Sequence, residues 1–90
     1  MEGGEVRAVL ADKAVLAQYM TYRGETVRSL AAKTLISGGR RRKPVHPSLI
    51  GHLRSGKRRT CGVETAAAIE RALDVPSGVL FRVQVRYRAA

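Results

Sequence analysis

The charges of this 90-residue chain are distributed unevenly, and this distribution limits how the chain can fold. Residues 26–63 contain no Asp or Glu and ten basic side chains: Arg28, Lys33, Arg40, Arg41, Arg42, Lys43, Arg54, Lys57, Arg58 and Arg59. Elsewhere seven basic residues balance seven acidic ones, so the net charge of +10 arises entirely from this segment. Cations without acidic partners are rarely buried, so we expect the segment to line the surface. A neutral scaffold with one strongly positive surface suits a polyanion, and the alternatives are a basic linker or a solubilising surface.

Size and composition exclude several classes of protein. A chain of 90 residues with 44% apolar side chains forms one small domain with a modest core, which leaves no room for a deep catalytic cavity. The sequence has no catalytic triad, no close carboxylate pair and no phosphate-binding glycine loop, so we predict neither enzymatic activity nor a cofactor. No apolar run is long enough for a membrane span, and the N-terminus lacks a signal-peptide pattern. We therefore expect a soluble, cytoplasmic protein, without a membrane partner or a small-molecule substrate.

The cysteine and the histidines do not form a recognisable reactive or metal site. Cys61 is the only cysteine, so no internal disulfide can form. We expect it to be unreactive because no neighbour is an obvious base, although Arg58 and Arg59 would lower the pKa of its thiol. His46 and His52 have no Cys or carboxylate close by in the sequence, so we predict no metal ligand. For His46 we expect a helix cap or a phosphate contact instead.

Apolar periodicity predicts a series of short helices, which cover residues 12–23, 26–37, 46–56, 63–73 and, as a single turn, 77–81. Asp12 and Thr26 are suitable N-caps for the first two helices. Pro47 suits the first helical position of the third.

Between the second and third predicted helices, Gly38 and Gly39 are followed by four consecutive cations at residues 40–43. Glycine breaks the helical pattern and like charges repel, so we expect residues 38–43 to form an extended basic loop. The loop is either a flexible solvated linker or an arm that contacts a polyanion. We favour the arm, because four adjacent cations are costly to hold together without a polyanion nearby.

The C-terminal residues change from helical to alternating periodicity. Val83, Val85 and Tyr87 alternate with basic and polar residues, which is typical of a strand with one apolar face. A single strand requires a partner. Residues 5–10 have weaker strand character and can pair with it, or two such tails can pair across a homodimer through Val83, Val85 and Tyr87.

Several short motifs follow one another between residues 12 and 81. Leu16, Met20 and Gly24 come first, and Thr-Val-Arg-Ser-Leu-Ala follows at residues 26–31. Residues 45–56 are Val-His-Pro-Ser-Leu-Ile-Gly-His-Leu-Arg-Ser-Gly, and residues 64–81 include Leu-Asp-Val-Pro and end in Leu-Phe. Each motif is weak alone, but in this order and spacing they resemble the helix-turn-helix domains of the Cro/repressor (lambda-repressor-like) family of phages and bacteria.

The resemblance implies an all-α fold. This would be a compact five-helix helix-turn-helix DNA-binding domain over residues 12–81, with an expanded basic turn between helices two and three and a short C-terminal β-strand. Residues 1–11 would form an N-terminal segment, partly disordered or a short strand, and residues 82–90 a tail with a dimer contact. The resemblance assigns base contacts to Pro47, Ser48, Gly51 and His52. Together with the charge pattern, it assigns DNA backbone contacts to Arg28, Arg40, Arg41, Arg42, Lys43, His46, Arg54, Lys57, Arg58 and Arg59.

Two features depart from the family pattern. An insertion centred on residues 37–44 expands the usual tight turn, and Val27 stands where a Gln normally opens helix two, so Arg28 would supply that backbone contact. The implied function is a sequence-specific double-stranded DNA-binding transcriptional regulator, of the phage repressor or Cro-like type, acting as a homodimer. Its recognition helix would cover about residues 46–55, with the basic loops 38–43 and 57–59 gripping phosphates. The alternatives are an RNA-binding or nucleoid-type module, or an accessory DNA-binding factor such as an excisionase or antitoxin component.

Overall fold

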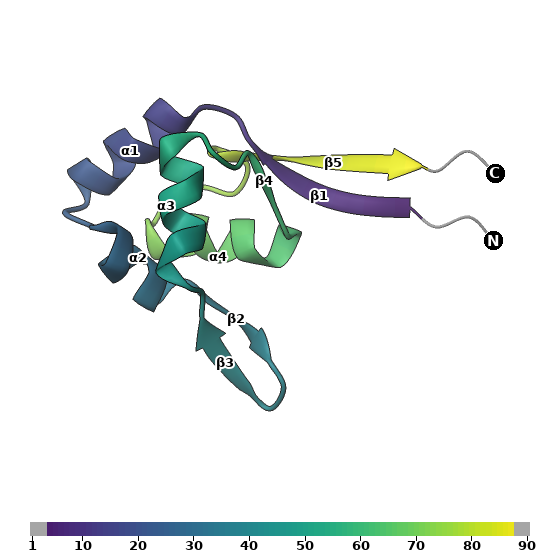
Figure 1. The fold of residues 1–90 in the computed structure, drawn as a ribbon, viewed down its shortest axis with the longest axis horizontal. Helices are drawn as coiled ribbons and strands as arrows, with labels where there is room; N and C mark the ends of the chain where they lie inside the picture. Colours follow the sequence, from purple (N-terminus) through teal and green to yellow (C-terminus); the bar gives the residue numbers. More distant parts are fainter. Residues whose placement is uncertain (1–3, 88–90) are drawn as a thin grey trace.

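A computed structural model describes residues 4–87. Within this range the chain forms four helices and five strands, and the strands make up two sheets (Figure 1). The elements are β1 (Gly4–Leu10), α1 (Lys13–Tyr22), α2 (Val27–Lys33), β2 (Leu35–Gly38), β3 (Arg41–Pro44), α3 (Pro47–Ser55), β4 (Thr60–Cys61), α4 (Val63–Ala72) and β5 (Phe81–Tyr87). The prediction of an all-α, five-helix fold was therefore wrong. The segment expected as a basic loop forms most of a β-hairpin, and the segment expected as a fifth helical turn is a loop that leads into β5.

β1 is the central strand of a three-stranded antiparallel sheet with the order β4-β1-β5. It pairs with β5 along its whole length, from Gly4 opposite Tyr87 to Leu10 opposite Phe81. The two strands form a ribbon that extends away from the helices (Figure 1). Of the two partners considered for the C-terminal strand, the N-terminal segment of the same chain is the one that pairs with it.

The segment predicted as a fifth helical turn, residues 77–81, is a loop that leads into β5. Gly78 has a φ of 90°, which does not fit a right-handed helix. The carboxylate of Glu70, on α4, accepts hydrogen bonds from the backbone N–H groups of Gly78, Leu80 and Phe81 at 3.1, 3.0 and 3.2 Å. Glu70 is only 4% exposed. This buried carboxylate, and not a helical turn, holds the loop in place.

The basic segment predicted as an extended loop is an antiparallel hairpin, β2–β3, which projects from the helical body next to α3 (Figure 1). Helix α2 ends at Lys33, before the predicted end near Ser37. Gly38 pairs with Arg41, so Gly39 and Arg40 form a two-residue turn. The φ of Gly39 is 73°, the positive value that a type II′ turn needs at its first position. Cross-strand hydrogen bonds and this turn therefore outweigh the repulsion between the cations.

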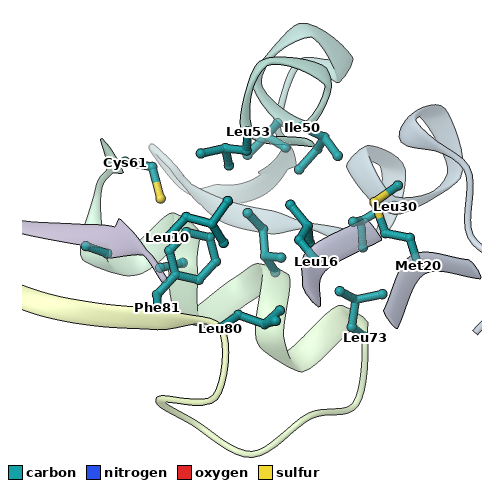
Figure 2. Close-up of a cluster of buried hydrophobic side chains, with 14 of the residues drawn as sticks. Leu10, Leu16, Met20, Leu30, Ile50, Leu53, Cys61, Leu73, Leu80 and Phe81 are labelled. Atoms are coloured by element: carbon teal, nitrogen blue, oxygen red, sulfur yellow. The ribbon is translucent and has the colours of Figure 1, made fainter. Parts of the chain in front are cut away.

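The helices and the three-stranded sheet enclose one hydrophobic core (Figure 2). Its largest fully buried apolar side chains are Leu16, Met20, Leu30, Ile50, Leu53, Ile69, Leu73 and Leu80. Leu10 and Phe81 lie opposite each other on β1 and β5 and close the core on the side of the sheet. Helix α3 is held in the core by Ile50 and Leu53, which leaves its opposite side facing outward.

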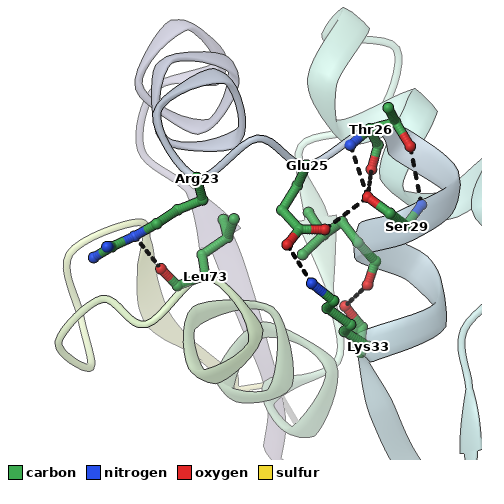
Figure 3. Close-up of polar contacts among 8 residues, drawn as sticks. Arg23, Glu25, Thr26, Ser29, Lys33 and Leu73 are labelled. Carbon is green, nitrogen blue, oxygen red and sulfur yellow. Dashed lines mark hydrogen bonds and ion pairs between the residues drawn. The ribbon is translucent and has the colours of Figure 1, made fainter.

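The starts of α1, α2 and α3 follow the sequence prediction. The side chain of Asp12 accepts a hydrogen bond from the N–H of Ala14, and Thr26 accepts one from Ser29. The Ser29 hydroxyl in turn accepts from the N–H of Thr26, which completes a capping box (Figure 3). Pro47 is the first residue of α3. The N-caps Asp12 and Thr26 and the helix start at Pro47 are thus confirmed.

Candidate nucleic-acid interface

Helices α2 and α3 pack against each other, although a hairpin joins them in place of a tight turn. Of the four residues predicted to contact bases, Ser48 and His52 lie on the side of α3 opposite Ile50 and Leu53, and Pro47 and Gly51 lie at its edges. Ser48 is exposed, whereas Pro47, Gly51 and His52 are half-buried. The structure therefore brings the four residues together on one helix surface, although Ser48 is the only one of them that is exposed.

His46 is the N-cap of α3, one of the two roles expected of it. Its Nδ1 accepts a hydrogen bond from the N–H of Ser48 at 3.1 Å and lies 2.8 Å from the Ser48 hydroxyl. A ring nitrogen that accepts carries no proton, so the proton of the neutral ring is on Nε2. The hydroxyl donates to the same Nδ1, which leaves its lone pairs free. Ser48 is thereby prepared to accept hydrogen bonds from a partner.

Gly51 lies where α3 contacts α2. A Cβ at this position would have only Val27 Cγ1 within 4 Å, at 3.9 Å. Val27 is half-buried against the core, so the residue in place of the expected Gln contributes packing. The adjacent Arg28 is exposed at the start of α2 and remains available for the predicted backbone contact.

Substitution of Gly51 by Ala should raise the free energy of unfolding by about 0.5–1 kcal/mol, because alanine favours a helix and the space for its methyl group is open. Gly56→Ala is the matched control. Gly56 has a φ of 87°, and a Cβ there would lie 2.9 Å from Lys13 Cδ. This control should lose about 1–2 kcal/mol. Urea denaturation followed by circular dichroism measures both, and a destabilised Gly51→Ala would contradict the packing described for α2 and α3.

The loop after α3 is tied to the end of that helix. The Arg58 N–H donates to the carbonyl oxygen of His52 at 3.0 Å, and its Nε donates to the carbonyl oxygen of Thr60 at 2.8 Å. From α1, Lys13 Nζ donates to the Ser55 carbonyl oxygen at 3.2 Å, which places a cation at the negative end of the α3 dipole. Lys57 and Arg59 are exposed between these anchors. The predicted phosphate clamp is therefore held at a fixed position beside α3.

One face of the β2–β3 hairpin is directed toward α4. The Ser37 N–H and hydroxyl both donate to Glu64 Oε2, at 2.9 and 2.6 Å. Arg42 pairs with Ser37 across the strands and lines a hollow with Leu35 and Arg71. The charge of Arg42 also helps to lower the pKa of Glu64, although the hydrogen bonds from Ser37 are the larger cause.

The other face of the hairpin is directed toward α3. Ile36 and Lys43 pair across the strands and line a groove of about 550 Å³ together with Ser48 and His52. Lys43 lies along the backbone of Gly38, because a Cβ at Gly38 would be 2.6 Å from the Lys43 side chain. Side chains alternate along a strand, so Arg41 shares the face of Lys43. The hairpin thus presents Arg41 and Lys43 toward the α3 side and Arg42 toward α4.

The attachment of the hairpin to Glu64 should depend on pH. The pKa of Glu64 is lowered from 4.5, so the contact with Ser37 stabilises the folded chain fully above pH 4.5. This stabilisation is lost as the pH falls through the lowered pKa of Glu64. We expect the Ser37 amide resonance in a ¹⁵N NMR titration to move with a midpoint below pH 4.5. Glu64→Gln should abolish this transition, whereas Glu5→Gln, on β1, should leave it unchanged. A midpoint at or above the ordinary value would contradict the contact.

Most of the cations in residues 26–63 have no acidic partner. Within residues 4–87 the ion pairs are Lys33–Glu25 and Arg23–Asp74. Glu25 binds Lys33 and the Ser29 hydroxyl, which together lower the pKa of its carboxyl group (Figure 3). Lys33 was not among the predicted backbone contacts. The other nine cations of the segment are all exposed and, in the described part of the chain, form no ion pair: Arg28, Arg40, Arg41, Arg42, Lys43, Arg54, Lys57, Arg58 and Arg59.

Cys61 is buried on β4, and burial raises the pKa of its thiol to about 11. The nearby positive charges of Arg58 and Arg7 act in the opposite direction but are smaller effects. The thiol therefore stays protonated at neutral pH. Among residues 4–87, no group of three or more His, Cys, Asp or Glu side chains is placed to hold a metal ion.

The residues predicted as dimer contacts lie on β5. Val83 and Val85 are 64% and 47% exposed, and the side chain of Tyr87 lies outside the described residues. Val6, opposite Val85 on β1, is 48% exposed. Three valines therefore form an exposed apolar surface on one face of the β1–β5 ribbon, which we call the valine face.

Sequence reasoning missed Lys13 and Glu64, which hold α3 and the hairpin in place, and Glu70, which holds the loop before β5. Lys13 reaches α3 across 42 positions of sequence, and Glu64 reaches the hairpin across 27. No local pattern indicates such contacts. For Glu70 a weak signal exists, since an acidic residue among the apolar positions of the α4 pattern requires a buried partner.

Comparison with protein families, curated proteins and solved structures gave no match for this chain. No helix in residues 4–87 has the length and apolar character needed to cross a membrane.

Proposed function

We propose that the chain is a sequence-specific double-stranded DNA-binding transcriptional regulator of the phage repressor or Cro-like type. The observation that carries the proposal is the set of nine exposed cations without ion pairs, of which all but Arg42 lie on the elements around α3 without facing α4. They lie at the start of α2, on the hairpin, near the end of α3 and in the loop that follows it. Such an arrangement lets a helix enter the major groove while its surroundings neutralise phosphates.

The outward side of α3 offers few groups for base recognition. Ser48, with its hydroxyl donating to His46, is an acceptor suited to the amino groups of adenine or cytosine. His52 can donate to a guanine or a phosphate, and Pro47 and Gly51 supply shape or contact with a thymine methyl group. Most of the affinity would then come from phosphate contacts and DNA shape.

A homodimer on paired half-sites fits the valine face, because an exposed apolar surface on one molecule can pack against the same surface of a second copy. Val83→Glu should therefore lower the molar mass that light scattering measures at concentrations where the wild-type chain dimerises. Deletion of residues 82–90 is a poor test, because it also removes the strand that pairs with β1. A dimer that persists unchanged in Val83→Glu would exclude the valine face as its interface.

Fluorescence anisotropy with a 24-base-pair DNA duplex, the RNA duplex of the same sequence and the single DNA strand tests the choice of nucleic acid. We expect the DNA duplex to bind most tightly, with an affinity that falls steeply with salt. Base stacking on single strands has little support, because Phe81 is buried and Tyr22 is exposed on α1, outside the basic surface. Tighter binding of the RNA duplex would favour the RNA-binding alternative, and binding of none of the three would reject the proposal.

A further inference from the structure

We infer that the tip of the β2–β3 hairpin reaches a minor groove of DNA, next to the major groove that α3 occupies, and that the side chains of Arg40 and Arg41 enter this groove and sense its width. This inference rests on the proposed function. It adds a second point of sequence recognition, in a part of the chain that carries no helix.

The hairpin is attached where α3 would meet the bases. Only Val45 and His46 separate β3 from the first residue of α3, and the N-terminal residues of a recognition helix are those that contact base edges. The base of the hairpin is fixed by the Val45 N–H, which donates to the Thr34 carbonyl oxygen at 3.0 Å. Farther along, Ser37 is bound to Glu64. The hairpin therefore extends from α3 as a supported arm.

The dimensions of the hairpin suit the neighbouring minor groove. Each strand has four residues, which corresponds to a reach of roughly 13 Å. The helical repeat of B-DNA is about 34–36 Å, so the centres of adjacent major and minor grooves are roughly 17 Å apart. The arginine side chains at the tip can span the remaining few ångströms. Two paired strands lie about 4.8 Å apart, which nearly equals the minor groove width of about 6 Å, so the arginine side chains at the tip can enter the groove while the ribbon stays at its edge. Gly39 has no side chain and open space around it, which lets the tip of the hairpin come close to the DNA, whereas the Lys43 side chain covers Gly38.

The cations of the hairpin are sorted by face. Arg42 is directed to α4, where Ser37 and Glu64 lie on the same side. Arg41 shares the opposite face with Lys43, on the side of the α3 groove, and Arg40 is in the exposed turn. Arg40 and Arg41 are therefore free to contact DNA ahead of the hairpin, whereas Arg42 is turned away from it. Arg41 and Arg42 are adjacent and carry the same charge, but they therefore have different roles.

The chemistry of the groove predicts which sequences this arm prefers. Runs of A·T pairs have a narrow minor groove with an enhanced negative potential that attracts arginine. The amino group of guanine projects into the minor groove and marks G·C pairs there. Inosine lacks this amino group but keeps the major-groove edge of guanine. An I·C pair therefore presents the minor groove of A·T together with the major groove of G·C.

Anisotropy titrations of the intact chain with three 24-base-pair duplexes, made only of A·T, G·C or I·C pairs, test the inference. We expect the I·C duplex to bind about tenfold more tightly than the G·C duplex, and nearly as tightly as the A·T duplex. Arg41→Ala should remove most of this difference. Arg42→Ala, which removes the same charge from the other face, should keep it.

Each outcome of these titrations supports or overturns a particular part of the inference. Equal affinities for I·C and G·C overturn the minor-groove contact while leaving the proposed function intact, because a major-groove reader treats these duplexes alike. Equal losses of preference in Arg41→Ala and Arg42→Ala overturn the assignment by face. Absence of binding to all three duplexes rejects the proposed function itself. Circular dichroism of each variant establishes that the fold is retained.

Discussion

Replacement of Arg40, Arg41, Arg42 and Lys43 by Ala should weaken the binding of every DNA duplex, roughly 100-fold or more at 0.1 M salt for A·T-rich sequences and less for G·C-rich ones. Each phosphate contact releases condensed counterions and contributes about 0.9 to the slope of log affinity against log salt. Arg42 faces α4, so three contacts are lost, and the slope should flatten by about 2.7. Between 0.05 and 0.2 M salt, the wild-type chain would lose roughly 40-fold more affinity than the variant. Anisotropy titrations across this range measure both quantities.

The control for this prediction is Arg82→Ala, which removes an exposed cation from β5, outside residues 26–63. It should change the slope by much less than one unit, because the residue lies outside the proposed interface. A quadruple variant that is folded and keeps the wild-type slope would show that the hairpin does not contact phosphates. The inferred contact with the minor groove would then fail as well.

Glu70→Ala should lower the free energy of unfolding by about 4 kcal/mol, an effect as large as the loss of a fully buried leucine side chain. Its carboxylate accepts from three backbone N–H groups of the loop before and at the start of β5. Removal leaves the buried N–H groups of Leu80 and Phe81 without partners, at about 1–3 kcal/mol each, whereas the N–H of Gly78 is more exposed. A domain of this size has a total stability of only about 5–13 kcal/mol, so the melting temperature should fall by about 20 °C. Guanidinium and thermal denaturation measure the change.

Glu70→Gln provides the graded comparison, because its amide oxygen can still accept while the charge is lost. We expect a loss of about 1–2 kcal/mol, since hydrogen bonds to a charged acceptor are roughly twice as strong as neutral ones. If Glu70→Ala does not fold at all, Glu70→Gln still tests the account. Wild-type stability in both variants would show that the loop does not depend on the carboxylate.

The positions of the helices could be predicted from the sequence because their signals are local. Asp12 and Thr26 cap helices whose first turns begin at the next residue, and Pro47 marks the start of α3. The apolar positions that face the core recur at helical spacing. The same applies to β5, where alternating residues indicated a strand.

The strands of the hairpin could not be predicted in this way because their stability comes from outside the segment. Residues 40–43 contain only cations, a composition typical of a solvated loop. Their pairing depends on the turn at Gly39 and on the attachment of Ser37 to Glu64, on another element. Likewise, residues 77–81 have helical spacing, but the carboxylate of Glu70 binds their N–H groups. In the hairpin and in residues 77–81, contacts between residues far apart in the sequence therefore determine the structure.

The candidate site was predictable in its charge but not in its arrangement. The acid-free segment correctly indicated where exposed cations lie. It did not show that Glu25 and Glu64, the acids just outside its two ends, fold back against Lys33 and Ser37. These contacts neutralise one cation and orient the hairpin, so the segment is less uniformly positive in space than in sequence.

Selection of binding sites from a random-sequence duplex library, at 0.05 and 0.2 M salt, tests the central claim most directly. We predict recovery of one motif at both salt concentrations, arranged as a palindrome if the valine face forms a dimer. Ser48→Ala and His52→Ala should lower the enrichment of this motif more than they lower the affinity for an unrelated duplex. Recovery of no motif by the wild-type chain at either salt concentration would contradict sequence-specific DNA recognition.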